Sequence, residues 1–247
     1  NSYVQPNVSR YIANLADQLR GNGVHAELAI LRSDGGLASP DVATSNPVSL
    51  LLSGPAGGVA GAVWAAEQAG HSDFLTFDMG GTSTDVALVQ NSKPRIGRET
   101  SVGDLKVRAT SVDVRTVGAG GGSIAHVPAL TQALRVGPQS AGAVPGPAAY
   151  ATGGEEPTVT DANVMLGRVQ AGHFPHVFGE GGDAPLDLAE VRRRFTTLAE
   201  HIAAQTGDTR TPEEVAAGFL AVAVQNMAGA VKRISVQKGH DVTSYAL

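Results

Sequence analysis

The sequence has no cysteine, few aromatic residues and no long run of charge of one sign. Without cysteine, the chain has no disulfide, no cysteine–zinc site and no cysteine nucleophile. Aromatic residues are 4% of the chain and hydrophobic residues 42%, so the expected core is aliphatic and rich in alanine. The formal net charge of −5 is dispersed along the chain, which argues against a dedicated surface for nucleic acid or for an anionic membrane.

Long apolar runs are also missing from the sequence. No run approaches membrane-spanning length, and no signal-peptide pattern opens the chain, so we expect a soluble, cytoplasmic protein. The chain begins at Asn1 without an initiator Met and stops at Leu247 inside a short apolar run. These two ends lead us to expect a segment of a longer protein, truncated on both sides.

The pattern of apolar residues predicts an α/β protein. A length of 247 residues suits one large domain or two lobes. Apolar residues at helical spacing, with capping residues and glycines at the ends, predict helices, and short apolar or alternating runs predict strands. The expected helices are 8–20, 58–69, 162–168 (capped by Thr160 or Asp161), 188–205 and 211–238, the last opened by a Thr211–Glu214 capping box. The expected strands are 27–31, 48–52, two or three within 94–117, 124–127 and a strand starting at 241–247, with a long Gly/Pro loop at 134–158.

The most informative stretch is 77–89, FDMGGTSTDVALV. An apolar strand ends at Asp78, two glycines turn the chain, three hydroxyl residues follow, and Asp85 precedes a second apolar strand. Glycine lets the backbone approach an anion, hydroxyls donate to phosphate oxygens, and a carboxylate at a strand end can hold Mg²⁺. The pattern therefore predicts a β-hairpin whose tip binds a phosphate and a metal. A tight turn with polar decoration is the alternative.

A second glycine-rich stretch, GAGGGS at 118–123, follows the predicted strands. Alone it indicates a flexible turn as readily as a nucleotide loop. Together with the hairpin it gains weight, because two such loops at strand ends can converge on one ligand.

Several blocks of the chain, in order, resemble the hydantoinase A/5-oxoprolinase family, which belongs to the superfamily of actin, sugar kinases and chaperone ATPases. The blocks are LLSGPAGGVAGA, FDMGGTSTDVALV, VGAGGGSIA, LRVGPQSAGAVPGPAAY and EPTVTDANVMLGR. The resemblance implies a ribonuclease H-like (actin-like ATPase) lobe with a mixed sheet and flanking helices. It divides residues 1–247 into the end of a preceding lobe (1–52), a core that holds the second phosphate loop (53–168) and a helical part (169–247). The first phosphate loop and the adenosine loop of such proteins are not in the chain, so we expect these residues alone to hydrolyse little ATP.

The resemblance also implies a function: use of Mg²⁺ and ATP to phosphorylate an amide carbonyl of a cyclic amide and so open the ring. Asp78 would hold Mg²⁺ through water or orient the attacking group, and Asp85 would anchor the turn or the metal's outer shell. The expected nucleotide contacts are Gly80, Gly81, Thr82, Ser83 and Thr84 at the hairpin and, near the nucleotide or the substrate, Gly120, Gly121, Gly122 and Ser123. Asp161 and Asn163 are candidates on the substrate side, with helix capping as the alternative.

The implied partners are a small-molecule substrate, either a cyclic amide or a ketone, and a hydantoinase B-type subunit or domain, without nucleic acid or membrane. Two alternatives stay open. One is the ATP-using subunit of a ketone carboxylase of the acetone or acetophenone type, and the other is a nucleotide-switched binding module without catalysis. A Rossmann domain is disfavoured, because the glycines of the hairpin are followed by a strand and not by a helix.

Overall fold

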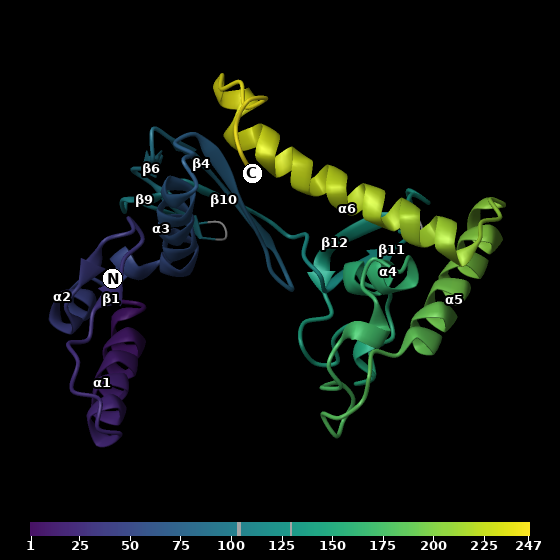
Figure 1. Ribbon diagram of the computed structural model, residues 1–247, viewed down its shortest axis with the longest axis horizontal. Helices are drawn as coiled ribbons and strands as arrows, with labels where there is room; N and C mark the ends of the chain where they lie inside the picture. Colours follow the sequence, from purple (N-terminus) through teal and green to yellow (C-terminus); the bar gives the residue numbers. More distant parts are fainter. Residues whose placement is uncertain (103–104, 129) are drawn as a thin grey trace. The chain divides into compact units, whose positions relative to one another are not determined.

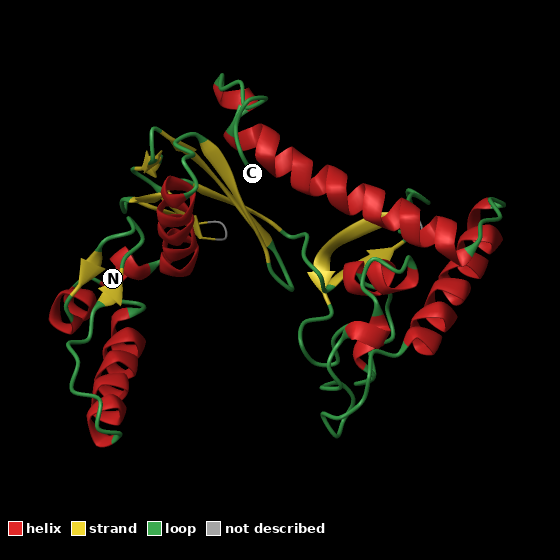
Figure 2. Cartoon of the chain, viewed as in Figure 1, coloured by secondary structure: helices red, strands yellow, loops and turns green. Residues whose placement is uncertain are grey.

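The computed structural model describes residues 1–102, 105–128 and 130–247, which form two compact units (Figure 1). The first unit comprises Asn1–Phe77, Val86–Arg115 and Ile234–Leu247, and the second comprises Asp78–Asp85 and Thr116–Arg233. Both units contain helices and strands, so the predicted α/β class is confirmed (Figure 2). The boundaries of these units differ from the predicted boundaries, which lie after residues 52 and 168. The reason is that strand pairing joins segments that are distant in the sequence.

The helices of the first unit are α1 (Gln5–Gly21), α2 (Pro40–Ser45) and α3 (Ser53–Gln68). The predicted helix at 8–20 is confirmed, and the one at 58–69 begins five residues earlier, at Ser53. The strand predicted at 48–52 is wrong, because Pro47–Leu50 form a single 3₁₀ turn and Leu52 has a φ of 60°. Such a short, mostly apolar run does not distinguish a strand from a buried helical turn, and proline favours the start of a helical turn.

A four-stranded sheet lies at the centre of the first unit. Its strands β3 (Phe74–Met79), β4 (Thr84–Gln90), β5 (Lys93–Pro94) and β10 (Val114–Val117) have the order β10-β4-β3, with β5 also paired to β4. The run of four apolar residues from Val86 to Val89 is wholly buried, which is the pattern of a central strand covered on both faces. Ala56 and Val59 of α3 share a core with Phe74, Ala87 and Val89. The predicted hairpin at 77–89 is thus confirmed.

The other strands of the first unit are short. They are β1 (Ile30–Leu31), β2 (Leu37–Ala38), β6 (Ile96–Gly97), β7 (Thr100–Val102), β8 (Leu105–Val107) and β9 (Ser111–Val112), paired as β1-β2, β6-β9 and β7-β8. The predicted strand at 27–31 shrinks to two residues, and the stretch 94–117 forms more and shorter strands than expected. Residues 103 and 104 of that stretch lie outside the described residues. The strand expected at 241–247 is reduced to one parallel bridge between Ala246 and Phe74.

The second unit packs helices against a two-stranded sheet. Strands β11 (Ser123–His126) and β12 (Arg135–Ser140) are antiparallel, and the helices are α4 (Val159–Met165), α5 (Leu188–Thr206) and α6 (Pro212–Ile234). Their core contains Ala125 and Val136 from the strands, Val164 from α4, Phe195 from α5 and Phe219 from α6. The return strand at 124–127 is confirmed, shifted by one residue, whereas the long loop expected at 134–158 is wrong over its first part, which is β12.

Two helix ends differ from the prediction. The N-cap of α4 is Thr158, so that helix starts before Thr160 and Asp161. The Thr211–Glu214 capping box of α6 is confirmed, with the Glu214 carboxylate accepting from the Thr211 N–H and the Thr211 hydroxyl accepting from the Glu214 N–H. Helix α6 ends at Ile234, and a separate 3₁₀ turn at Val236–Lys238 leads to Gly239, whose φ is 83°.

Together with the 3₁₀ turn, α6 is long and apolar enough to cross a membrane by length and composition, with a mean hydropathy of 1.4. This departs from the expectation that no run approaches membrane-spanning length. Val215, Phe219 and Ala223 of this helix are buried in the core of the second unit. A helix that forms a protein core meets the same criterion, so the observation carries little weight.

Candidate functional site

The tip of the β3–β4 hairpin is an open turn with polar groups on its surface. The Gly80 N–H donates to the Ser83 carbonyl at 2.9 Å and closes the turn. Asp78, Gly80, Gly81 and Thr82 are exposed. Within the described part of the chain, the N–H groups of residues 81–83 and the Asp78 carboxylate have no hydrogen-bond partner. Three consecutive N–H groups without an internal acceptor, two hydroxyls and a carboxylate are therefore gathered at this tip.

Asp85 is more constrained than Asp78. Its Oδ1 accepts a hydrogen bond from the Thr116 hydroxyl at 2.5 Å, and its side chain is half-buried. Thr116 belongs to β10, the strand beside β4. The first acid of the motif thus faces solvent, while the second is held by a neighbouring strand.

Thr84 differs from the other hydroxyl residues of the turn. Its side chain is fully buried, and its hydroxyl donates to the Ala119 carbonyl at 2.6 Å. The Thr84 hydroxyl is therefore engaged inside the protein, and it ties the hairpin to the glycine-rich stretch 118–123.

That glycine-rich stretch lies directly against the hairpin tip. The Gly121 N–H donates to the Gly80 carbonyl at 3.0 Å, and the Gly122 N–H donates to the Gly81 carbonyl at 2.6 Å. The Gly120 N–H donates to the Ser123 hydroxyl at 2.8 Å. All three glycine N–H groups therefore have acceptors within the protein. The stretch 118–123, which we call the brace, supports the hairpin and does not present these N–H groups to a phosphate.

The closeness of the two stretches explains one of these glycines. A Cβ on Gly120 would lie 2.7 Å from both the Gly80 carbonyl oxygen and the Ser83 nitrogen. Backbone atoms cannot move aside as a flexible side chain can, so only glycine fits there. The structure thus brings together the two glycine-rich stretches that the sequence predicted to converge.

Ser140 and Thr160 are neighbours of this site that the sequence prediction missed. The hydroxyl oxygens of Ser140 and Thr82 are 3.4 Å apart. The Thr160 N–H donates to the Gly121 carbonyl at 2.8 Å. Ser140 lies opposite Ser123 because the register of β11 and β12 shifts between Ser123 and Ala125, and a regular hairpin pairing of the two strands would not have placed it there.

Asp161 lies in α4 and is fully buried. Its carboxylate accepts from the N–H groups of Ala148, Ala149 and Thr158 and from the Thr158 hydroxyl, at 2.7–3.2 Å. Burial raises the pKa of this carboxyl, and the four hydrogen bonds oppose that rise. Since its oxygens are all engaged, the geometry agrees with the helix-capping alternative: Asp161 completes a capping box with Thr158.

Asn163 also has an internal partner, because its Nδ2 donates to the Val159 carbonyl at 2.9 Å. The hydrogen bonds of both α4 residues are thus made within their own helix and the loops beside it. Their role on the substrate side stays a prediction.

The hairpin tip is compatible with Mg²⁺. Among the described residues, no group of three or more His, Asp or Glu side chains is arranged to hold a metal on its own. Mg²⁺ does not need one, since it keeps several waters and binds through one or two carboxylates together with substrate phosphates. Asp78, which is exposed, and Asp85, which has a second carboxylate oxygen, fit that requirement.

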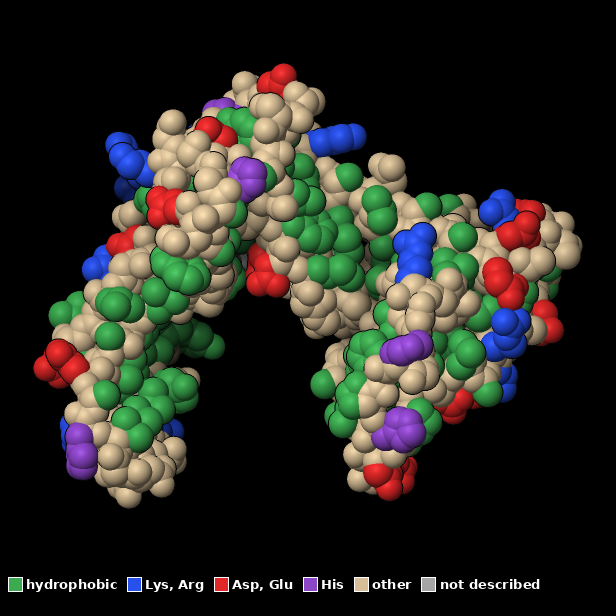
Figure 3. Space-filling model, in the orientation of Figure 1, with side chains coloured by type: hydrophobic (Ala, Val, Ile, Leu, Met, Phe, Trp, Pro, Cys, Tyr) green, Lys and Arg blue, Asp and Glu red, His purple; other side chains and the backbone are tan. Residues whose placement is uncertain are grey.

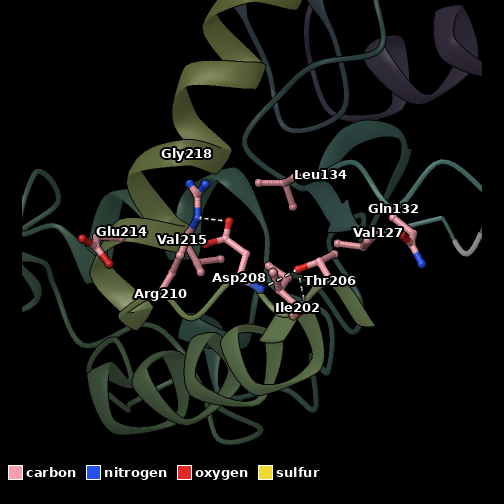
Figure 4. A pocket seen from close by; sticks show the side chains of 10 residues that line it. All are labelled: Val127, Gln132, Leu134, Ile202, Thr206, Asp208, Arg210, Glu214, Val215 and Gly218. Carbon is pink, nitrogen blue, oxygen red and sulfur yellow. Dashed lines mark hydrogen bonds and ion pairs between the residues drawn. The ribbon is translucent and has the colours of Figure 1, made fainter. Parts of the chain in front are cut away.

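A pocket of about 240 Å³ lies elsewhere in the second unit (Figure 4). Ile202, Leu134 and Val215 form its apolar wall. The polar groups at its mouth are paired with one another or with the backbone, as in the Arg210–Asp208 ion pair at 2.7 Å. The pocket therefore lacks the free converging polar groups of a catalytic site.

On the face shown in Figure 3, basic and acidic side chains are interspersed, without a patch of one sign.

Comparisons with known proteins agree on one family. A family model described as Hydantoinase/oxoprolinase matches residues 1–247. The chain is 36% identical over 256 residues to 5-oxoprolinase 1 of Arabidopsis thaliana, a match that covers 100% of the chain and 20% of that protein. It is 33% identical over 248 residues to the caprolactamase subunit alpha of Pseudomonas jessenii, with 100% and 34% covered.

Two solved structures are similar in fold. The ATP-dependent caprolactamase from Pseudomonas jessenii has a TM-score of 0.80 and 32% identity, and the match covers 100% of this chain and 34% of that one. A nucleotide-free acetone carboxylase has a TM-score of 0.79 and 26% identity, covering 95% and 31%. The chain thus spans about a fifth to a third of the length of these relatives.

Proposed function

The chain belongs to the hydantoinase/oxoprolinase family, and from that premise we propose that it is part of an ATP-dependent hydrolase that opens a cyclic amide. The single observation that carries the proposal is the hairpin tip, where an exposed carboxylate, three free N–H groups and two hydroxyls meet. Relatives named 5-oxoprolinase and caprolactamase support the substrate class, because both names refer to cyclic amides.

We further propose a ribonuclease H-like, actin-like fold for the ATPase. Support comes from the order of the elements: α3 leads into the β3–β4 hairpin, and the acid–Gly–Gly–hydroxyl motif lies at the tip of that hairpin. The parallel bridge between Ala246 and Phe74, beside antiparallel pairings, agrees with a mixed sheet.

The proposed chemistry starts from the low reactivity of an amide carbonyl. Attack of the carbonyl oxygen on the γ-phosphorus of ATP forms a P–O bond and releases ADP, which leaves an imidate-type phosphate. Water then adds to the activated carbon, and the C–N bond breaks, so that the ring opens and the nitrogen leaves as an amine after taking up a proton. A second water hydrolyses the remaining acyl phosphate to a carboxylate and free phosphate. The protein contributes mainly position and neutralisation of charge.

In this scheme the groups at the tip either hold phosphate oxygens or supply a carboxylate. The N–H groups of residues 81–83 and the hydroxyls of Thr82 and Ser83 hold phosphate oxygens. Asp78 orients the attacking group or holds water of the Mg²⁺ shell, and Asp85, kept in place by Thr116, steadies the turn. Mg²⁺ bound there would supply neutralisation of the phosphate charge.

The proposed partners are a small-molecule substrate and a hydantoinase B-type subunit or domain. The similarity to a protein named as the alpha subunit of caprolactamase supports the second. A cytoplasmic location is proposed on the composition of the chain alone.

The substitution Asp78→Asn tests the proposed function in the intact protein that carries this chain. We expect substrate-stimulated ATP turnover to fall at least ~100-fold, which is a typical loss for a group that acts in acid–base or charge-stabilising catalysis. Asp78 is exposed and Asn has the same shape, so the melting temperature should not change. The matched control is Asp17→Asn, which removes an exposed carboxylate from α1. Unchanged ATP turnover in Asp78→Asn would contradict the role assigned to Asp78.

A ketone carboxylase is the second candidate, favoured by the similarity to acetone carboxylase. ATP hydrolysis measured with 5-oxoproline, hydantoin, caprolactam, or acetone plus bicarbonate separates the two, since each activity predicts stimulation by its own substrates. ATP binding without stimulation by any of these compounds would favour a nucleotide-switched binding module.

A further inference from the structure

Two hydroxyl groups from different elements face each other at the hairpin tip. Thr82 belongs to the turn between β3 and β4, and Ser140 ends β12. Their hydroxyl oxygens are 3.4 Å apart. Strong O–H···O bonds are about 2.5–3.0 Å long, so the two hydroxyls do not satisfy one another well. A single oxygen that accepts from both, about 2.7 Å from each, is compatible with that separation.

The hydroxyl of Ser140 is oriented by its own loop. Its oxygen accepts a hydrogen bond from the Gly142 N–H at 3.2 Å, which leaves the hydroxyl proton free to donate elsewhere. Gly142 has a φ of +63°, a conformation that glycine adopts without strain. The loop after β12 therefore holds Ser140 as a donor.

The glycine-rich stretch also leaves room for Ser140. A Cβ on Gly122 would lie 2.9 Å from the Ser140 hydroxyl oxygen and 3.0 Å from the Gly81 carbonyl oxygen. The Ala141 N–H donates to the Gly122 carbonyl at 2.9 Å, so the end of β12 is fastened to the same glycine that contacts the hairpin. Ser140 and the hairpin tip are thus held against one common backbone segment.

We propose that Ser140 contacts the nucleotide, and that its hydroxyl and the Thr82 hydroxyl donate to the same phosphate oxygen at the hairpin tip. The proposal rests on the proposed function, since it takes the ligand at the tip to be ATP. It extends the site to a strand and a loop, Ser140–Gly142, that the sequence motif does not contain.

The proposal is tested by measuring, with calorimetry on the intact protein, the binding of a non-hydrolysable ATP analogue in the presence of Mg²⁺. Loss of one hydrogen bond to a charged oxygen at a partly exposed site corresponds to about a tenfold weaker binding. We therefore expect Ser140→Ala to raise the dissociation constant about tenfold, and Ser140→Thr, which keeps the hydroxyl, to stay within about threefold of the wild type. The matched control is Thr196→Ala, because the Thr196 hydroxyl is bonded to the Arg192 carbonyl of its own helix.

A double-substitution cycle tests whether the oxygen is shared. If Thr82 and Ser140 donate to one oxygen, each hydroxyl helps to position the oxygen that the other one binds. The fold-increase in the dissociation constant of the double variant should then differ clearly from the product of the two single fold-increases. Independent, multiplicative losses would contradict the shared contact. If Ser140→Ala does not fold, Ser140→Cys keeps the size of the side chain with a weak donor and provides the same comparison.

The outcomes separate this inference from the proposed function. A wild-type protein that binds the analogue, with Thr82→Ala weakened and Ser140→Ala unchanged, would overturn the role of Ser140 alone. A wild-type protein that does not bind the analogue would overturn both.

Discussion

At the scale of single residues, the three consecutive glycines at 120–122 meet different groups. Gly120 lies against the hairpin backbone, Gly121 against the Thr160 hydroxyl, and Gly122 against Ser140 and the hairpin. In each position an added Cβ would lie 2.7–3.0 Å from a neighbouring atom. The sequence favoured a nucleotide loop or a flexible turn, whereas the structure shows a packed brace whose glycines are needed for close approach.

The substitution Gly120→Ala tests the brace. The new Cβ would push the hairpin tip away, so we expect a loss of about 1–3 kcal/mol in the free energy of unfolding and clearly weaker ATP binding. The measurements are urea unfolding and calorimetry with an ATP analogue. Gly61→Ala is the control, because Gly61 lies in α3 with no atom within 4 Å of an added Cβ. Alanine in a helix interior should be neutral or stabilising by about 0.5–1 kcal/mol there. If Gly120→Ala and Gly61→Ala changed the free energy of unfolding and the binding of the analogue equally, the proposed role of the brace would be wrong.

Residues of one type take different roles at this site because their burial differs. Asp78 is exposed without an internal partner, while Asp161 is buried and accepts four hydrogen bonds. Thr82 is exposed and Thr84 is buried with an internal partner. For binding or catalysis, the exposed member of each pair is the stronger candidate, since the other's hydrogen-bonding capacity is already used.

At the scale of elements, the start of α5 carries a small charge network. The Glu190 carboxylate accepts from Arg193 and from Arg194, with N–O distances of 2.5–2.7 Å. Hydrogen bonding from Arg193, followed by the hydrogen bond and charge of Arg194, lowers the pKa of Glu190 to about 2. Arg192 instead pairs with Glu213 of α6 at 2.9 Å. The three consecutive arginines 192–194 are thus partly exposed, and each is paired with a carboxylate.

The network predicts a pH-dependent contribution to stability. The pKa of Glu190 is lowered from 4.5 in the unfolded chain to about 2, so its stabilisation is present above pH ~4.5 and is lost as the pH falls toward 2. Because the arginines are partly exposed, we expect Glu190→Gln to cost only about 1 kcal/mol at pH 7. The difference from wild type should shrink between pH 4.5 and about 2, as measured by urea unfolding across that range. Glu200→Gln, an exposed change on the same helix, is the control and should show no such trend. A cost that does not vary with pH would contradict the role of the charge.

At the scale of the whole molecule, each unit has its own core. The first unit packs α3 on the sheet that carries β3 and β4, and the second packs α4, α5 and α6 against β11 and β12. The hairpin tip and its brace belong to the second unit, although the stem strands lie mainly in the first. The stability of the second core therefore bears directly on the geometry of the site.

Helix α6 provides the test of that core. Phe219 is fully buried, and its ring centroid lies 6.4 Å from that of Phe195 on α5. We expect Phe219→Ala to lower the free energy of unfolding by about 3–5 kcal/mol, through lost burial and an unfilled cavity. Val224→Ala on the same helix, at a side chain that is 55% exposed, should change it by less than about 1 kcal/mol. Equal costs in urea unfolding would contradict the packing of α6 in this core.

Prediction from sequence succeeded where a pattern is long or chemically distinctive. The amphipathic helices α1, α5 and α6 and the hairpin with its acid–Gly–Gly–hydroxyl tip were all predicted. It failed for the 3₁₀ turn at Pro47–Leu50 and for β12, because short apolar or Gly/Pro-rich stretches take their conformation from their neighbours. Ser140 was missed for the same reason: its place depends on the pairing of β12 with β11.

The sequence by itself determined the class of the fold, the family resemblance and the hairpin motif, because these depend on residue type and on local spacing. The tertiary structure alone decided which of the polar residues are free. It buried Thr84 and Asp161, fastened Asp85 to Thr116 and placed Ser140 beside Thr82. The physical reason is that burial and hydrogen-bond partners come from segments distant in the sequence, whose contacts no local pattern records.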